Sequence, residues 1–122
     1  ALGGRRLGDD PAVRHKLADL HIEFAAGRLM AYRVAWMQGQ GQVPNYEASM
    51  SKAYGGELNQ RLTHMINAFG LGGMLAEGMM YAPLNGRLPL EYLNSIPLTI
   101  AAGTSEINRN IIATRGLGLP RQ

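Results

Sequence analysis

The sequence predicts an all-α fold, an antiparallel four-helix bundle, on three observations. Apolar residues recur at three- and four-residue steps along two long stretches, about 10–38 and 45–69, which is the period of one helix face. No stretch alternates apolar and polar residues with the period of two that a strand requires. The chain of 122 residues is the size of one domain, and two long helices, a loop at 74–89 and two short helices make an antiparallel bundle.

The first predicted helix begins at Pro11, with Asp9 or Asp10 as its N-cap. An Asp side chain accepts hydrogen bonds from the free amides of the first turn, and proline suits the first helical position because its missing N–H would have no partner there. Apolar residues lie on more than one side of this helix, which predicts packing on more than one side. Residues 39–45, "GQGQVPN", end the helix.

The second helix has Asn45 as its predicted cap and ends at the glycine-rich residues 70–73. Gly55 and Gly56 lie inside it, where each glycine costs about 1 kcal/mol relative to alanine. A glycine pair at such a cost predicts a close approach by another helix.

A third, shorter helix is expected from about Leu90 to Ile100, and Pro97 should kink or shorten it. The fourth starts after Gly103, with Thr104 or Ser105 as its cap, and ends at residues 116–120, "GLGLP".

Composition excludes several classes of protein. There is no cysteine, so disulfides, thiolate nucleophiles and cysteine-bound zinc are excluded. The net charge is +3, but the basic residues are scattered, so a nucleic-acid-binding bundle would rest on the pI of 9.6 alone. No apolar run approaches the roughly 20 residues of a membrane span, and no signal peptide is visible, so a cytoplasmic protein is expected. The amino end has no initiator methionine, which predicts a fragment of a longer chain.

Two motifs have ordinary explanations. "GLGG" at 70–73 is interpreted as a helix C-cap, since a dinucleotide loop would need a third glycine and a preceding strand. An alternative interpretation is that Gly72 and Gly73 let a ligand approach the backbone closely. His15, His21 and His64 have no acidic neighbours at metal-site spacing, so no metal is predicted. No carboxylate pair stands out as acid and base, and the catalytic residues stay unassigned.

"GTSEINRN", residues 103–110, is the strongest signal in the chain. A helix start offers free amides, and with the hydroxyls of Thr104 and Ser105 these could bind a phosphate. Glu106 opposes a phosphate beside it and would instead accept hydrogen bonds from a sugar or an amino group. Simple capping of the helix is the alternative.

Residues 99–120, "TIAAGTSEINRNIIATRGLGLP", resemble the carboxy-terminal signature of acyl-CoA dehydrogenases. "AFGLGGML" at 68–75, "ASMSKAYGGELNQRL" at 48–62 and "RRLGDDPAVRHKLADLHIEF" at 5–24 extend the resemblance, so that residues 1–122 match the C-terminal helical domain of this family.

The resemblance implies an FAD enzyme that removes two hydrogens from the α and β carbons of an acyl-CoA thioester. A Glu takes the α proton, the β hydrogen leaves as hydride to the flavin, and an electron-transfer flavoprotein accepts the electrons. Most members are tetramers in which FAD lies between the middle and C-terminal domains and touches a neighbouring subunit. By this resemblance Thr104 and Glu106 contact the flavin nucleotide, Gly73 lies beside the partner's FAD, Gly103 is the turn glycine and Arg109 is the arginine of the motif.

The chain departs from the family pattern where many members have the catalytic Glu, because it has Ala102, which has no proton acceptor. Gly3, Pro11 and Phe69 also stand where the family has FAD contacts. Two hypotheses follow. The chain is the C-terminal domain of an FAD-dependent acyl-CoA dehydrogenase, inactive in isolation, or it is a non-catalytic assembly subunit that completes a partner's FAD pocket. Either implies a homo- or hetero-oligomer.

Overall fold

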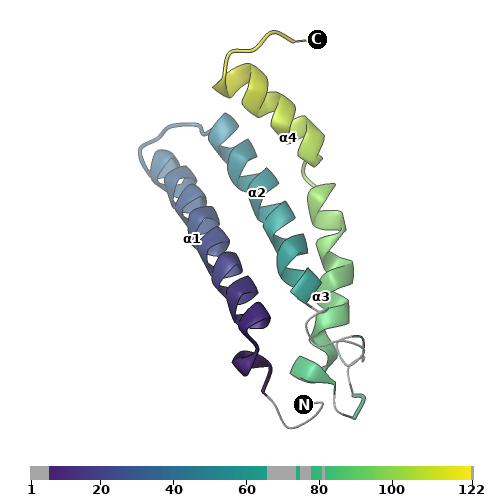
Figure 1. Ribbon diagram of the computed structural model, residues 1–122. Helices are drawn as coiled ribbons and strands as arrows, with labels where there is room; N and C mark the ends of the chain where they lie inside the picture. Colours follow the sequence, from purple (N-terminus) through teal and green to yellow (C-terminus); the bar gives the residue numbers. More distant parts are fainter. Residues whose placement is uncertain (1–5, 66–73, 75–77, 81, 122) are drawn as a thin grey trace.

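A computed structural model describes residues 6–65, 74, 78–80 and 82–121 (Figure 1). The α-helices are α1 (Pro11–Gly39), α2 (Tyr46–Thr63), α3 (Arg87–Ser95) and α4 (Ser105–Ile111). Short 3₁₀ turns occur at Leu7–Asp9, Pro83–Gly86 and Pro97–Thr99, and a π-helical turn, Ile112–Gly116, continues α4. Nowhere in these described ranges is there a strand, and the predicted all-α fold with four helices is confirmed.

Helix α2 is the central element of the fold. It runs antiparallel to α1, and α3 returns along its other side, while α4 crosses near its amino end (Figure 1). Helices α1, α3 and α4 each pack directly against α2. The position of every other helix is therefore set by its contacts with α2.

Helix α1 begins as the sequence predicts. The Asp10 side chain accepts a hydrogen bond from the amide of Ala12 at 2.8 Å, and Pro11 occupies the first turn. The helix ends at Gly39, where the amide of Gln40 still donates to carbonyls of the last turn. Local capping chemistry is enough to explain both ends.

Helix α2 starts after Asn45, but this side chain does not cap it in the expected way. No helix amide donates to it; its Oδ1 accepts a hydrogen bond from the Arg115 guanidinium at 3.0 Å instead. The Glu47 carboxylate accepts a hydrogen bond from the backbone amide of Asn45 at 3.3 Å. Asn45 is therefore at the N-cap position, as predicted. The prediction that its side chain caps the helix is wrong, because Arg115 donates to its side-chain oxygen instead. The helix ends at Thr63, with His64 as its C-cap, which is earlier than the predicted end at 70–73; residues 66–73 themselves lie outside the described residues.

Pro97 shortens the third helix as predicted. Helix α3 runs over Arg87–Ser95, and the 3₁₀ turn Pro97–Thr99 follows it. The helix begins three residues before the predicted Leu90, after Gly86 in the left-handed region with φ of 73°. Glycine adopts this conformation without steric cost.

The interior of the described region is thin. Its buried hydrophobic residues are Leu20 and Leu58, at 4% and 8% exposure, so few apolar side chains are buried among the described residues. Between α2 and α3 the buried contact is polar. The Thr63 hydroxyl donates to Ser95 Oγ at 3.2 Å, and the Ser95 hydroxyl donates to the carbonyl of Tyr92 at 2.7 Å.

Of the two glycines inside α2, Gly56 accounts for a close approach. A Cβ built on Gly56 would lie 3.1 Å from the carbonyl oxygen of Leu98, in the 3₁₀ turn that follows α3. A Cβ on Gly55 would meet nothing within 4 Å. On the other side of α2, Gly27 of α1 lies against the Tyr54 ring, 3.2 Å from such a Cβ. The close-approach prediction is confirmed for Gly56 and wrong for Gly55.

Candidate functional site

A pocket of about 370 Å³ lies between α2 and the start of α4. Predicted residues Thr104 and Glu106 both line it. The complete lining is Glu57, Gln60, Thr99, Ile100, Thr104, Ser105, Glu106 and Arg109. The fold thus brings the "TSE" motif together with polar side chains from α2, about fifty residues earlier in the chain.

A left-handed turn leads the chain into this pocket. Ala102 has φ of 57° and Gly103 has φ of 94°. Gly103 suits this conformation, and a Cβ there would also lie 3.3 Å from the side-chain nitrogen of Asn108. Ala102 is a non-glycine residue in a region that L-residues rarely adopt. Gly103 is therefore required by the turn, while Thr104 and Glu106 line the pocket itself.

Asn108 holds this turn, and the sequence analysis did not identify it. Its side chain is 5% exposed, and Nδ2 donates to the carbonyls of Gly103 and Thr104 at 2.9 and 3.0 Å. The available signal was its spacing, because Asn108 lies three and four residues before Ile111 and Ile112 and so shares their helix face. A polar residue on that face needs internal partners.

The start of α4 largely satisfies its own amides. Thr104 Oγ1 accepts a hydrogen bond from the Ile107 amide at 3.3 Å. Hydrogen bonds to the Glu106 carboxylate from its own amide and from the Thr104 hydroxyl, with the nearby Arg109 guanidinium, hold the pKa of Glu106 below its ordinary value of 4.5. The ionised carboxylate disfavours a phosphate beside it, and the Thr104–Ile107 hydrogen bond agrees with the capping interpretation.

An ion pair crosses the pocket from α4 to α2. The Arg109 guanidinium lies 2.6 Å from Glu57 Oε1, with both side chains partly exposed. Beside it, the amide nitrogen of Gln60 donates to the Thr99 hydroxyl at 3.4 Å. The lining therefore carries two carboxylates, Glu57 and Glu106, for one guanidinium. Such a lining favours sugar hydroxyls or amino groups over a second anion.

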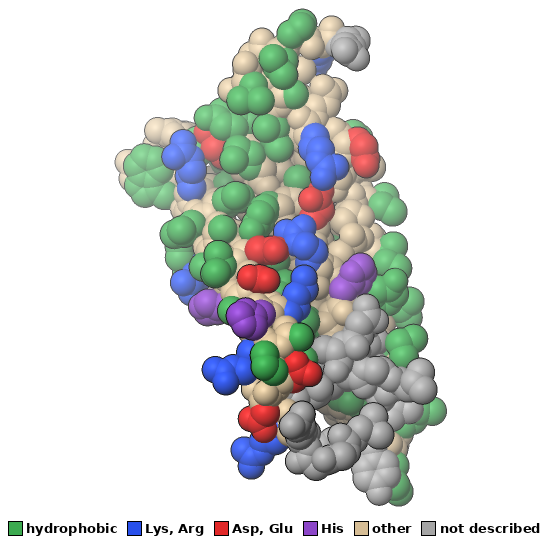
Figure 2. Space-filling view, viewed as in Figure 1, with side chains coloured by type: hydrophobic (Ala, Val, Ile, Leu, Met, Phe, Trp, Pro, Cys, Tyr) green, Lys and Arg blue, Asp and Glu red, His purple; other side chains and the backbone are tan. Residues whose placement is uncertain are grey.

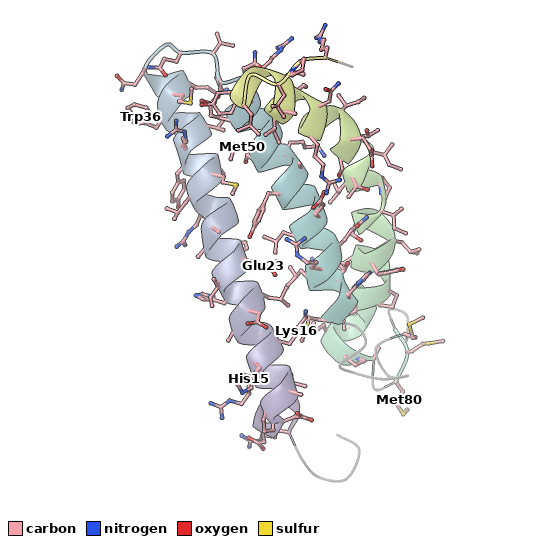
Figure 3. The ribbon with its side chains drawn as sticks, turned by 45° about the horizontal axis from the view of Figure 1, so that its top comes forward. His15, Lys16, Glu23, Trp36, Met50 and Met80 are labelled. Carbon is pink, nitrogen blue, oxygen red and sulfur yellow. The ribbon has the colours of Figure 1, made fainter. Side chains whose placement is uncertain are left out.

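The remaining candidate residues do not form a site in the described ranges. His15 and His21 are exposed on α1, with His15 labelled in Figure 3, and His64 lies against the Tyr92 ring at 5.7 Å between centroids. Within the same ranges no three His, Asp or Glu side chains are grouped for a metal, and no helix has the length and apolar character to cross a membrane. Gly73 lies outside the described residues.

Comparison with known proteins gives a consistent result. Residues 1–117 match the family model described as "Acyl-CoA dehydrogenase, C-terminal domain". The chain is 35% identical over 118 residues to acyl-CoA dehydrogenase FadE34 of Mycobacterium tuberculosis, a match that covers 94% of this chain and 16% of that protein. It is 33% identical over 117 residues to an L-prolyl-[peptidyl-carrier protein] dehydrogenase of Serratia sp., covering 95% of this chain and 28% of that one.

Solved structures match over nearly the same length. The steroid ACAD Tcur3481-Tcur3483 superposes with a TM-score of 0.90 at 26% identity, over 95% of this chain and 30% of its own. The ChsE4-ChsE5 complex from Mycobacterium tuberculosis superposes with a TM-score of 0.89 at 30% identity, over 100% of this chain and 32% of its own. The chain thus spans less than a third of each of these relatives. It belongs to the acyl-CoA dehydrogenase family, and it corresponds to the C-terminal helical domain of that family.

Proposed function

We propose that this chain works as the C-terminal domain of a longer, FAD-dependent acyl-CoA dehydrogenase, and that the pocket between α2 and α4 receives part of the FAD. The observation that carries the proposal is the meeting of Thr104 and Glu106 with polar side chains of α2 in one open pocket. Had both residues been buried among the helices, no cofactor could reach them. Glu106 is instead exposed and Thr104 half-buried.

The lining fits an uncharged, polar part of the cofactor. Thr99 and Ser105 offer hydroxyls, Gln60 offers an amide, and the Glu106 carboxylate accepts hydrogen bonds. The pyrophosphate fits less well, because the lining has two carboxylates for one guanidinium and α4 caps its own amides. When bound, FAD supplies the hydride acceptor for α,β-dehydrogenation. The residues of this chain bind and orient it.

The base for the reaction is proposed to come from a part of the protein outside residues 1–122. Ala102 lies in the turn at the pocket, but its methyl group cannot accept a proton. The 122 residues alone are therefore predicted to be inactive toward an acyl-CoA thioester. In the full-length protein, an electron-transfer flavoprotein is the proposed electron acceptor, and a cytoplasmic location is part of the same proposal.

The exposed apolar side chains of α1 support association with a second subunit. Ile22, Leu29 and Trp36 recur every seven residues and are 67%, 67% and 60% exposed, and Trp36 points away from α2 (Figure 3). Apolar side chains also gather on the upper part of the face shown in Figure 2, over α1 and α2. Large exposed apolar patches are typical of protein interfaces. We propose a homo- or hetero-oligomer in which a second subunit covers the α1 face that carries Ile22, Leu29 and Trp36.

A second candidate function is favoured by Ala102. A subunit without its own base would serve as an assembly subunit that completes a partner's FAD pocket, and two of the similar structures carry two-component names, Tcur3481-Tcur3483 and ChsE4-ChsE5. The two candidates differ in whether the protein alone reduces its flavin.

The test uses the full-length protein, purified alone and then together with any co-encoded homologue. A flavin absorbance spectrum is recorded before and after anaerobic addition of an acyl-CoA. Bleaching in the protein alone supports the enzyme, whereas bleaching only in the co-purified complex supports the assembly subunit. For the pocket, Gln60→Leu is compared with Gln38→Leu, which lies at the exposed end of α1. Equal flavin retention in both variants would place the FAD elsewhere.

A further inference from the structure

We infer that Lys52 and Gly56 of α2 are positioning residues that fix one wall of the pocket, Leu98–Ile100, and thereby set the affinity for FAD without touching it. The inference rests on the proposed function, since it assigns a role toward the same cofactor. Neither Lys52 nor Gly56 lines the pocket. Their proposed role is to hold the residues that do.

Both residues act on the same carbonyl oxygen. The Lys52 ammonium donates a hydrogen bond to the carbonyl of Leu98 at 2.5 Å. Gly56, one helical turn later on the same face of α2, lets the α2 backbone come so near that a Cβ would lie 3.1 Å from this oxygen and 3.7 Å from Thr99 Cγ2. The Lys52 hydrogen bond holds the Leu98 carbonyl against α2, and the missing side chain of Gly56 leaves room for that carbonyl.

The segment that they hold is short and weakly stabilised by itself. It is the 3₁₀ turn Pro97–Thr99, closed by hydrogen bonds from the amides of Thr99 and Ile100 to carbonyls three residues earlier. Hydrogen-bond geometry in 3₁₀ turns is poorer than in α-helices. Thr99 and Ile100 line the pocket directly, so a displacement of Leu98 by a few tenths of an ångström moves the pocket wall.

The chain that follows this turn is held separately, at Gly103 and Thr104. Asn108 donates to the carbonyls of Gly103 and Thr104, and the Arg109–Glu57 ion pair ties α4 to α2. The wall is therefore held on α2 at Leu98, with the longer hydrogen bond from Gln60 to Thr99 beside it, and the chain beyond it is held by α4 at Gly103. A change at Leu98 alters the shape of the pocket while α4 stays in place.

The adjacent glycines provide a matched pair of variants for the full-length protein. Gly55→Ala and Gly56→Ala both raise helix propensity, but only the second pushes against a backbone carbonyl. We expect the dissociation constant for FAD to rise about tenfold in G56A, the equivalent of losing one hydrogen bond. In G55A it should stay within about twofold of the wild-type value, because that Cβ meets open space.

The lysine is tested by loss and rescue. Lys52→Met keeps the length of the side chain and removes the donor, so FAD should bind about tenfold more weakly, as for the loss of one charge-assisted hydrogen bond. Lys52→Arg retains a donor and should recover most of the affinity. A thermal melt of each variant shows that the protein is folded before FAD is titrated.

A second readout does not depend on the cofactor. Amide hydrogen exchange over residues 99–104 in the flavin-free protein should be faster in K52M and G56A than in wild type and G55A. If wild-type protein binds no FAD, the proposed function fails, and the exchange rates still decide whether α2 positions the wall. If the wild type binds FAD and K52M and G56A bind it with wild-type affinity, the inference is overturned, whatever their exchange rates.

Discussion

Asn108 gives the sharpest test of the turn that leads into the pocket. Asn108→Ala removes both hydrogen bonds from Nδ2, at 2.9 and 3.0 Å, to the carbonyls of Gly103 and Thr104. At about 1 kcal/mol for each bond, less about 0.5 kcal/mol for the better helix propensity of alanine, the free energy of unfolding should fall by about 1.5 kcal/mol. The assay is urea denaturation followed by circular dichroism at 222 nm.

In the Asn108→Asp variant the new side chain has nearly the shape of asparagine, and the stability of the variant should depend on pH. At pH 7 its carboxylate would face two carbonyl oxygens in a site that is 5% exposed, so the variant should be less stable than N108A. These oxygens disfavour the charged form and raise the folded-state pKa of the new carboxyl above its unfolded value of about 3.9. The penalty is therefore absent below about pH 4 and grows as the pH rises through the raised pKa. A variant as stable as N108A at pH 7, or a deficit relative to wild type that acidification leaves unchanged, would refute the assigned contacts.

Two further predictions concern the rest of the domain. Leu58→Ala should lower the free energy of unfolding by about 2–5 kcal/mol, because Leu58 is 8% exposed; Leu62→Ala on the same helix, at 49% exposure, should cost less than about 1 kcal/mol in the same denaturation assay. Equal losses would contradict the assigned interior. The pKa of Glu47 is lowered from its ordinary 4.5, chiefly by its own amide and also by hydrogen bonds from Tyr46 and Asn45 and by Arg33, so its ionised form stabilises the fold above pH 4.5 and this stabilisation is lost as the pH falls through the lower folded value. Glu47→Gln should therefore cost stability at pH 7 and approach wild type near pH 3, and a difference independent of pH would count against this role.

The parts of the fold that the sequence predicts correctly depend on neighbouring residues. Asp10 caps α1 through an amide two residues later, Pro97 stops α3 through its own ring and missing N–H, and Thr104 caps α4 through an amide three residues later. In each case the interacting groups lie within one helical turn. Residue type and order are then sufficient.

The parts that it misses depend on contacts between distant segments. The side-chain oxygen of Asn45 accepts a hydrogen bond from Arg115, seventy residues away, and no residue near Asn45 in the sequence predicts that partner. Gly55 and Gly56 are indistinguishable in the sequence, and only the place of Leu98 separates them. The buried role of Asn108 depends on a left-handed turn at Ala102, a conformation that sequence alone does not favour for alanine.

Helix α2 contacts α1 and residues 87–99 in different ways, and this bears on which pieces of the fold can be exchanged between relatives. Toward α1 it presents the Tyr54 ring and Leu58 to Gly27. The Glu23 side chain points toward α2 and pairs with Arg61 at 2.6 Å (Figure 3), the Tyr54 hydroxyl donates to the Glu23 carbonyl at 3.1 Å, and Arg33 lies 3.9 Å from Glu47. Toward residues 87–99 the hydrogen bonds from Lys52 and Thr63 are joined by the close approach of the Gly56 backbone to the Leu98 carbonyl. A chimera could accept a foreign α1 of matching size that keeps a carboxylate at position 23 and a cation at position 33. A foreign 87–99 segment would have to bring its own α2 with it.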